Sequence, residues 1–314
     1  NETVFDKKAA PDHLIVIGGG PIGSELAQAH RRLGCRVTIL EMFSVLGKDD
    51  QELAEVVKTR MKAEGIVMRE GIKIIKVERA DNGIAVVIEE DGKEERIEGS
   101  DLLVSAGRVP NLEGLDLEAA GIEYDKRGVT VDARLRTTNK KVFAIGDAAG
   151  GFQFTHVAGY HAGIVIRNVL FRLPAKVDYS ALPWVTYTDP ELAHVGMTEA
   201  QAKEKHGDIR VLRHSFAEND RAQAERETDG MAKVITTAKG VIVGASIVGP
   251  HAGELLQSWI LPIQKKMKIG AVAGLIIPYP TLGEVNKRAA GSFYTPKLFS
   301  EKTKKIVRFL LRFG

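Results

Sequence analysis

The sequence predicts an α/β fold at its beginning and an α+β fold at its end. Residues 14–17 are an unbroken apolar run followed by glycines, a pattern typical of a buried parallel strand that leads into a helix. From about residue 181, short strands alternate with helical patterns, which indicates a mostly antiparallel sheet with helices. The length of 314 residues leaves room for about two to three domains.

The composition, with 44% hydrophobic and 27% charged residues, is that of a globular protein. A net charge of +3 gives no indication of a nucleic-acid partner. Because no apolar run approaches the roughly 18 residues of a membrane span and no signal peptide is evident, we expect a cytoplasmic location. Asn1 is not an initiator methionine, so we expect the chain to have been trimmed or cut. The single cysteine, Cys35, excludes an intrachain disulfide, and its apolar surroundings favour a packed thiol over a reactive one.

Residues 13–41 have the pattern of a strand, a glycine loop, a helix and a second strand. Gly18, Gly20 and Gly23 fit G-x-G-x-x-G, in which the first glycine makes a tight turn, the second lets a pyrophosphate approach and the third lets helix and strand pack closely. Glu41 ends the second strand 18 residues after Gly23, where a carboxylate takes ribose hydroxyls. Together these features predict a Rossmann-type dinucleotide-binding domain in preference to a merely structural βαβ unit.

Glu41 also bears on the choice of nucleotide. A 2′-phosphate beside a carboxylate is repelled, and NADP sites normally supply an arginine there. Residues 42–44 contain no arginine, although Arg36 is nearby in the sequence. The sequence therefore predicts NAD as the nucleotide.

The remaining elements follow from apolar periodicity and turn residues. We expect a helix over residues 49–64, a hairpin turn at Asp91-Gly92, and a short strand over 142–145 that ends at Gly146-Asp147. The other expected strands cover residues 74–77, 84–88, 94–97, 102–105, 184–187, 210–216, 232–236 and 241–248.

Six segments occur in an order that resembles the pyridine nucleotide-disulfide oxidoreductases, the flavin-dependent family of dihydrolipoamide dehydrogenases, glutathione reductases and mercuric reductases. They are GGGPIGSE, SAGRVPN, TTNKKVFAIGD, FTHVA, YTDPELAHVGMTEAQA and YPTLGEVNKRAAG. The resemblance implies an NAD-binding domain (1–107), the C-terminal part of an FAD-binding domain (108–180) and a dimerisation domain (181–314) of a homodimer. We expect the family's N-terminal FAD half, with its own glycine fingerprint and redox-active cysteine pair, to be lacking from this chain.

By this resemblance, Asp147, next to Gly146, holds the ribityl hydroxyls of FAD, while Thr155 and His156 lie beside the isoalloxazine ring. Aspartate is also a favoured helix cap, so capping is the alternative role for Asp147. A histidine such as His156, taken without the FTHVA motif, is more often a loop residue whose hydrogen bonds are made within the protein.

Two further residues match positions of the family that meet the nicotinamide nucleotide. Glu25, two residues after Gly23, resembles the glutamate at the nicotinamide end, with an exposed acid on the helix surface as the alternative. Gly107 resembles the glycine whose backbone passes the nucleotide.

The segment Tyr279-Pro280-Thr281 departs from the family pattern. Members that reduce dithiols carry a histidine at the first position, which acts as an acid-base group across the dimer, and a glutamate that orients it. Tyr279 and Glu284 occupy these catalytic places here. A phenol has a reference pKa of about 10 and is a poor base near neutrality, and we expect it to donate a hydrogen bond to Glu284. The C-terminus also lacks the cysteine pair of mercuric reductases, so no residue is assigned to a metal.

The C-terminal residues have the pattern of a basic amphipathic helix. Ile306, Phe309, Leu310 and Phe313 follow the spacing i, i+3, i+4, i+7. Basic residues surround them, namely Lys304, Lys305, Arg308 and Arg312. Two interpretations stay open: contact with an anionic membrane surface, or docking on the protein's own dimer.

The main functional hypothesis is a flavin-dependent oxidoreductase that passes hydride from NADH to FAD and on to a disulfide, supplied by the missing segment, or another acceptor. The expected substrate is a small molecule or a dithiol or disulfide. By itself, this chain is expected to hold FAD weakly and to be inactive. The alternative is a non-catalytic NAD-binding and dimerisation fragment without flavin or redox disulfide.

Overall fold

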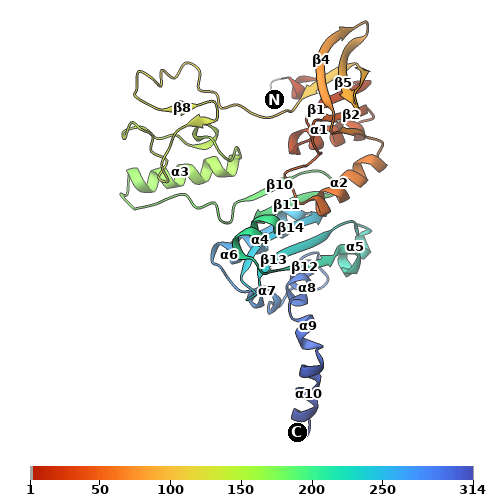
Figure 1. Ribbon diagram of the computed structural model, residues 1–314, viewed down its shortest axis with the longest axis vertical. Helices are drawn as coiled ribbons and strands as arrows, with labels where there is room; N and C mark the ends of the chain where they lie inside the picture. The colour runs from red at the N-terminus through yellow and green to blue at the C-terminus, as the bar shows by residue number, and fades with distance from the viewer. Residues whose placement is uncertain (1–2, 314) are drawn as a thin grey trace. The chain divides into compact units, whose positions relative to one another are not determined.

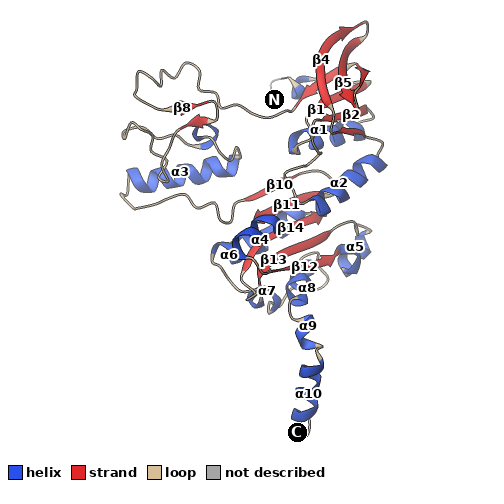
Figure 2. Ribbon diagram, in the orientation of Figure 1, coloured by secondary structure: helices blue, strands red, loops and turns tan. Residues whose placement is uncertain are grey.

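The computed structural model describes residues 3–313, which form two compact units. The first unit joins residues 3–106 to residues 180–313, and the second comprises residues 107–179. Figure 1 traces the chain by residue number, and Figure 2 distinguishes its helices from its strands. Within residues 3–313, none of the helices has the length and apolar content needed to cross a bilayer.

A parallel four-stranded sheet lies at the centre of residues 3–106, after a short 3₁₀ helix (Val4–Asp6). Its strand order is β3-β2-β1-β7, so the chain starts in the middle of the sheet. The strands are β1 (His13–Ile17), β2 (Arg36–Glu41), β3 (Val67–Glu70) and β7 (Asp101–Val104), and the helices are α1 (Pro21–Arg32) and α2 (Gln51–Ala63). This arrangement confirms the predicted α/β fold.

The side chains of β1 alternate between two cores, which explains why its apolar run is unbroken. Leu14 and Val16 pack with residues of α1 and α2, whereas Ile15 packs on the opposite face against an antiparallel sheet of order β4-β5-β6. The strands of that sheet are β4 (Lys73–Ala80), β5 (Gly83–Glu90) and β6 (Lys93–Gly99). The predicted turn at Asp91-Gly92 joins β5 to β6, with both residues at positive φ.

Residues 180–313 form a five-stranded antiparallel sheet of order β10-β11-β14-β13-β12, packed with helices. Its strands are β10 (Pro183–Thr186), β11 (Glu191–Gly196), β12 (Ile209–Ser215), β13 (Met231–Thr237) and β14 (Ile242–Gly249). Its helices are α4 (Glu199–His206), η3 (Phe216–Glu218), α5 (Asp220–Glu225), α6 (Ala252–Gln264), α7 (Gly270–Ala273), α8 (Glu284–Ser292), α9 (Thr295–Leu298) and α10 (Glu301–Leu310). Trp259 and Phe216 are fully buried in its core. The predicted α+β part is thereby confirmed.

The parallel sheet and the five-stranded antiparallel sheet of the first unit are joined by a shared core and by a buried ion cluster. Leu192 and Val248 of the antiparallel sheet pack with the residues of α1 and α2. The buried ammonium of Lys233 lies 2.6 Å from Asp50 and 2.9 Å from Glu52, at the start of α2. Residues 3–106 therefore pack directly against the five-stranded sheet of residues 180–313.

The second unit contains little regular structure. Its elements are β8 (Tyr124–Asp125), β9 (Gly128–Val129), η2 (Gly146–Ala149) and α3 (Thr155–Val169). Its small core consists of Leu117, Ile122, Val129 and Ala144 with a few half-buried neighbours.

Two features differ from the sequence-based expectations. The strand predicted over residues 142–145 is wrong, because this segment makes only one isolated bridge, from Phe143 to Arg136. An apolar run becomes a strand only where a neighbouring backbone offers a continuous ladder. In addition, β3 and β11 were not predicted, because charged or imidazole side chains interrupt their apolar patterns.

Candidate functional site

The glycine loop between β1 and α1 is shaped by two close backbone contacts. A Cβ on Gly23 would lie 1.9 Å from the carbonyl oxygen of Gly18, and a Cβ on Gly18 would lie 2.7 Å from that of Ser105. Gly18 also has a φ of +98°, which favours glycine. A Cβ on Gly20, by contrast, would have no heavy atom within 4 Å. The loop is thus tightly packed at Gly18 and Gly23 and open at Gly20.

The N-terminus of α1 faces this open position. Gly20 is its N-cap, Pro21 is its first residue, and no side chain within residues 3–313 caps it. Its first N–H groups are therefore directed out of the helix, where the positive end of the helix dipole attracts anions. The loop can accept a phosphate without displacing a protein group.

Glu41 is fixed at the C-terminal end of β2 by two backbone hydrogen bonds. The N–H of Gly19 donates to Oε2 at 2.7 Å, and the N–H of Phe43 donates to Oε1 at 2.9 Å. A carboxylate has about four acceptor positions, so two are left for ribose hydroxyls. Arg36 begins the same strand, about 16 Å away at roughly 3.3 Å per residue, and is too distant to pair with a 2′-phosphate beside Glu41.

Ser105 supports the glycine loop and was not predicted to do so. Its hydroxyl lies 2.8 Å from the carbonyl oxygen of Gly18 and 3.0 Å from that of Ile17. The residue directly follows β7, which pairs with β1, so it lies at the carboxyl edge of the sheet. That edge is where ligands bind in open parallel sheets, and this rule was the available signal.

Glu25 is half-buried, and its Oε1 accepts the N–H of Tyr187 at 2.8 Å. Burial raises the pKa of the Glu25 carboxyl, an effect that the hydrogen bond partly offsets. Glu25 is thus a partly buried acid on the helix surface that already accepts one hydrogen bond from the protein. Glu25 connects α1 to the residue that follows β10.

In the second unit, Asp147 lies in η2 directly after Gly146, which has a φ of +59°. Its side chain is 48% exposed, and Arg108 Nη1 lies 3.9 Å from the carboxylate. The alternative role as a helix cap is wrong, because η2 has Ile145 as its N-cap and α3 has Phe154, neither end with a side-chain cap among the described residues. The carboxylate is thus presented to solvent beside one cation.

Thr155 and His156 begin α3, and both are exposed. The imidazole of His156 stacks on Phe154 with ring centroids 5.1 Å apart. Gly107 has a φ of +120°, and a Cβ there would meet nothing within 4 Å. Each of these residues is therefore open to a ligand on at least one side.

Tyr279 is 69% exposed, and its hydroxyl donates to Asp220 Oδ2 at 2.7 Å. The expected hydrogen bond to Glu284 is wrong, because the single hydroxyl hydrogen of Tyr279 is donated to Asp220. Glu284 begins α8, where its charge suits the helix dipole. The hydrogen bond to Asp220 raises the pKa of Tyr279, and the charges of Asp220 and Glu284 act in the same direction. No local pattern indicated Asp220, which is 59 residues away.

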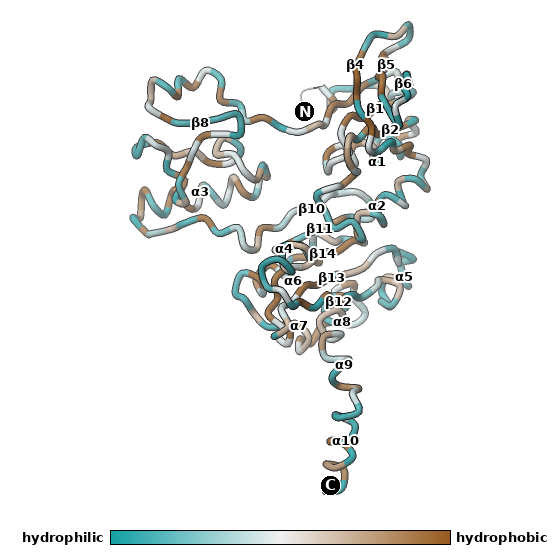
Figure 3. The backbone as a smooth tube through the Cα atoms, viewed as in Figure 1, coloured by the Kyte–Doolittle hydropathy of each residue, from teal (hydrophilic) through white to brown (hydrophobic). Residues whose placement is uncertain are grey.

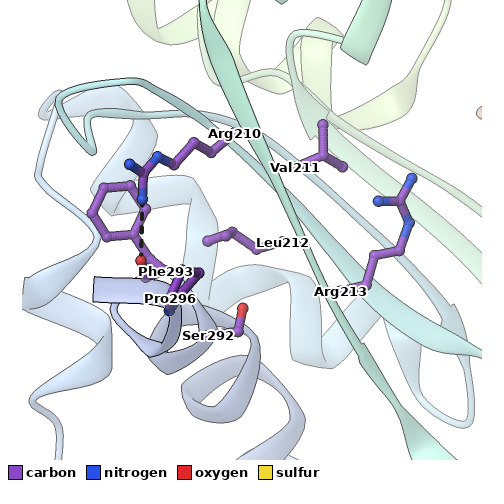
Figure 4. Close-up of a pocket in the computed structure, with 7 residues that line it drawn as sticks. All are labelled: Arg210, Val211, Leu212, Arg213, Ser292, Phe293 and Pro296. Carbon is purple, nitrogen blue, oxygen red and sulfur yellow. Dashed lines mark hydrogen bonds between the residues drawn. The ribbon is translucent and has the colours of Figure 1, made fainter. Parts of the chain in front are cut away.

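A pocket of about 380 Å³ lies beside β12 and is lined by none of the predicted site residues. Figure 4 shows Arg210 stacked over the Phe293 ring, at 4.6 Å from its centroid. The other guanidinium of the pocket, Arg213, forms two hydrogen bonds with Glu52. Arg213 is therefore paired with a carboxylate, whereas Arg210 contacts the Phe293 ring and donates to the Phe293 carbonyl oxygen. Within residues 3–313, no group of His, Cys, Asp and Glu side chains is arranged to hold a metal ion.

Comparisons with known proteins agree with the fold and with the motifs. The chain is 38% identical over 283 residues to the dihydrolipoyl dehydrogenase of Geobacillus stearothermophilus, covering 89% of this chain and 60% of that protein. It is 36% identical over 294 residues to the mercuric reductase of Staphylococcus aureus, covering 93% and 54%. The chain thus spans about 60% or less of the length of these relatives.

Solved structures show the same architecture. LpdA from Mycobacterium tuberculosis superposes with a TM-score of 0.85 at 28% identity, covering 92% of this chain and 63% of that one. The HOCl-induced flavoprotein disulfide reductase RclA from Escherichia coli gives a TM-score of 0.84 at 28% identity, covering 92% and 66%. Residues 1–162 match the family model of pyridine nucleotide-disulphide oxidoreductases, and residues 182–290 match the dimerisation domain of the same family. The chain therefore belongs to the pyridine nucleotide-disulphide oxidoreductase family.

Proposed function

We propose that this chain provides the NAD-binding and dimerisation parts of a flavin-dependent oxidoreductase, which passes hydride from NADH to FAD and on to a disulfide or another small-molecule acceptor. Family membership supports the reaction class. The observation that carries the nucleotide assignment is the placement of Glu41, held by two backbone N–H groups beside the open loop at Gly20.

Different residues around the glycine loop bind different parts of NADH. The N–H groups at the start of α1 bind the pyrophosphate, and Glu41 accepts the ribose hydroxyls and repels a 2′-phosphate. Glu25, in the first turns of α1, lies toward the nicotinamide end, where its raised pKa reflects a partly desolvated carboxyl. Gly107 matches the glycine whose backbone passes the nucleotide in the family, and a Cβ there would meet no protein atom within 4 Å.

Asp147 and the start of α3 provide the residues toward FAD, which supplies two-electron transfer when bound. The Asp147 carboxylate keeps acceptor positions for ribityl hydroxyls, because its neighbour Arg108 lies 3.9 Å away. Thr155 and His156 lie at the N-terminus of α3, close in sequence to Asp147. These exposed groups fit a polyhydroxylated ligand.

Titration of NADH and NADPH against native protein and Glu41→Gln tests the nucleotide assignment. We expect native protein to prefer NADH. Glu41→Gln should weaken NADH binding about 10- to 100-fold, the value of hydrogen bonds to a charged group, and should narrow the gap to NADPH. Glu94→Gln, an exposed residue of β6, makes the same change of charge and is the control. Equal or tighter binding of NADPH by the native protein contradicts the assignment.

We further propose that the protein is a homodimer. The match of residues 182–290 to a dimerisation domain supports this, as does the prevalence of two-fold pairing among oligomers. Light scattering at micromolar concentration should give twice the mass of the chain, and a monomeric mass contradicts the proposal.

A second proposal concerns location: α10 binds an anionic membrane surface. Six apolar side chains of this region are exposed, namely Ile306, Val307, Phe309, Leu310, Leu311 and Phe313. At helical spacing they cover an arc of about 200°, and Lys304, Lys305, Arg308 and Arg312 lie on the remainder. Figure 3 shows apolar and polar residues alternating along α10. A wide apolar face bordered by cations fits the boundary between acyl chains and anionic headgroups.

Sedimentation with lipid vesicles tests this location. We expect binding to vesicles of phosphatidylcholine with phosphatidylglycerol, and little binding to phosphatidylcholine alone. Lys304→Glu with Arg308→Glu should abolish binding, whereas Lys203→Glu with Lys205→Glu on α4 makes the same charge change and should have little effect. If the α10 variant dissociates a dimer and neither protein binds vesicles, the helix docks on a second copy and the membrane proposal is wrong.

A further inference from the structure

The second unit contains a buried imidazole that contacts the backbone directly before Asp147. His161 lies in α3 and is 1% exposed. Its Nδ1 accepts the N–H of Gly146 at 3.1 Å, and its Nε2 lies 2.6 Å from the hydroxyl oxygen of Tyr179. The ring thus connects three segments of the unit: η2, α3 and the end of residues 107–179.

These contacts determine the state of the ring. A backbone N–H can only donate, so Nδ1 must carry a lone pair. The hydrogen is therefore on Nε2, which donates to Tyr179, and the imidazole is neutral. The titratable rings that face it are Tyr179 and Tyr160, with centroids at 6.0 and 6.2 Å, and burial raises the pKa of Tyr179. Burial lowers the pKa of His161, which keeps the ring neutral.

The hydrogen bond to His161 restrains the peptide unit that presents Asp147. Gly146 is buried at a φ of +59°, and a Cβ there would lie 3.0 Å from Cβ of Ala158 in α3. The segment around Gly146 lacks a strand ladder, because residues 142–145 make only one bridge. In this unit, α3 takes the place of a sheet as the support for the carboxylate.

We propose that His161 is a positioning residue for Asp147, acting through the N–H of Gly146, with Tyr179 holding the imidazole in its tautomer. Its role toward a flavin ribityl chain rests on the proposed function. His161 itself touches no ligand. The His161 side chain instead keeps Asp147 in the orientation that accepts hydroxyl groups.

Nuclear magnetic resonance of the labelled chain tests the geometry. The ring nitrogens of His161 should report the Nε2–H tautomer at neutral pH. His161→Leu removes the acceptor and should speed amide exchange of Gly146 at least about tenfold, whereas His161→Gln offers an amide oxygen to Gly146 and an N–H to Tyr179 and should preserve the native rate. Tyr179→Phe removes only the outer contact and should give an intermediate rate. An Nδ1–H tautomer, or unchanged Gly146 exchange in folded His161→Leu, overturns the proposal.

Titration with FAD up to millimolar concentration, followed by the Asp147 amide resonance and flavin fluorescence, tests the role toward flavin. We expect His161→Leu to weaken binding about tenfold and His161→Gln to restore it. Native affinity should fall as the pH drops through the pKa of His161, which burial holds below 6.5, and His161→Gln should remove this dependence. Equal affinity in native protein and His161→Leu overturns this inference and leaves the flavin site standing. Absence of any FAD response at Asp147 in native protein overturns both the flavin site and this inference.

Discussion

Glu41 and Asp147 follow similar sequence patterns but have different structural support. Each is an acidic residue at the end of a short, mainly apolar segment, residues 36–41 for Glu41 and residues 142–147 for Asp147. Glu41 ends a strand that is paired on both sides, and two backbone N–H groups hold its carboxylate. Asp147 follows a segment with a single bridge, is 48% exposed and has Arg108 at 3.9 Å.

The difference between the two carboxylates shows that pairing within a sheet, more than the local sequence motif, determines how firmly a ligand-binding side chain is held. Parallel strands place the glycine loop and Glu41 at one edge, because their registers fix the ends of β1 and β2 side by side. Asp147 depends instead on a side-chain contact from α3, in which His161 accepts the N–H of Gly146, and no local sequence pattern encodes this contact. Ligand binding at Asp147 should therefore be more sensitive than binding at Glu41 to substitution of a single supporting side chain.

Substitution of Tyr279, whose hydroxyl contacts Asp220 59 residues away, should give the largest change, and the change is in reaction rate. In the full-length enzyme, with FAD and the redox disulfide of the N-terminal half in place, we expect poor dihydrolipoamide-dependent reduction of NAD, because a phenol hydrogen-bonded to Asp220 is protonated near pH 7. General acid-base help is typically worth about 10²- to 10⁴-fold, and Tyr279→His should recover part of it. The measurement is the rate of NAD reduction by native protein, Tyr279→His and the control Tyr279→Phe. A native rate equal to that of Tyr279→His refutes this prediction.

The glycine loop offers a matched pair of substitutions with the next largest effect. Gly23→Ala places a Cβ 1.9 Å from the Gly18 carbonyl, so it should cost about 1–3 kcal/mol of unfolding free energy and abolish measurable NADH binding. Gly20→Ala meets no protein atom, so stability should change by about 0.5 kcal/mol or less while NADH binding weakens about tenfold. Denaturant unfolding and NADH titration measure both quantities. An equal loss of unfolding free energy in Gly23→Ala and Gly20→Ala would contradict the prediction, because it would mean that the loop moves to accommodate the Cβ at residue 23.

Hydrogen exchange compares the two regions directly. Amides of β1 are buried between two cores, whereas those of residues 142–147 have few backbone partners. We expect exchange near Asp147 to be about 10- to 100-fold faster than in β1, because local opening there disrupts only a small core. Similar protection in both regions would remove the structural contrast between Glu41 and Asp147.

Much of the first region was predictable from sequence, because its signals are local. The apolar run of β1, the loop glycines and the position of Glu41 all lie within 29 residues, from His13 to Glu41. The strand expected over residues 142–145 failed because strand formation depends on a partner, and an apolar run does not reveal one. Asp220 escaped prediction because its contact to Tyr279 spans 59 residues. Local patterns thus predicted elements and the nucleotide loop, whereas pairings between distant side chains required the structure.

The smallest expected effect is on the stability of the protein in mild acid. It compares two buried imidazoles, His194 in the first unit and His161 in the second. Nε2 of His194 in β11 donates to the Gly196 carbonyl at 3.0 Å, and its Nδ1 lies 2.7 Å from the hydroxyl oxygen of Ser246. Burial lowers the pKa of both imidazoles below the ordinary 6.5.

In the unfolded chain these imidazoles take up protons at a higher pH than in the folded protein, so unfolding becomes more favourable as the pH falls below 6.5. The contribution of the neutral rings is complete above pH 6.5 and is lost as the pH falls through the lower folded pKa values. His194→Gln and His161→Gln should each flatten the pH dependence of the melting temperature. The Trp184 ring lies 4.3 Å from His194, so its fluorescence should report protonation of His194 and stay unaffected by His161→Gln. If one substitution removes the whole pH dependence, the two imidazoles do not act independently, and the separation into two units is wrong for this equilibrium.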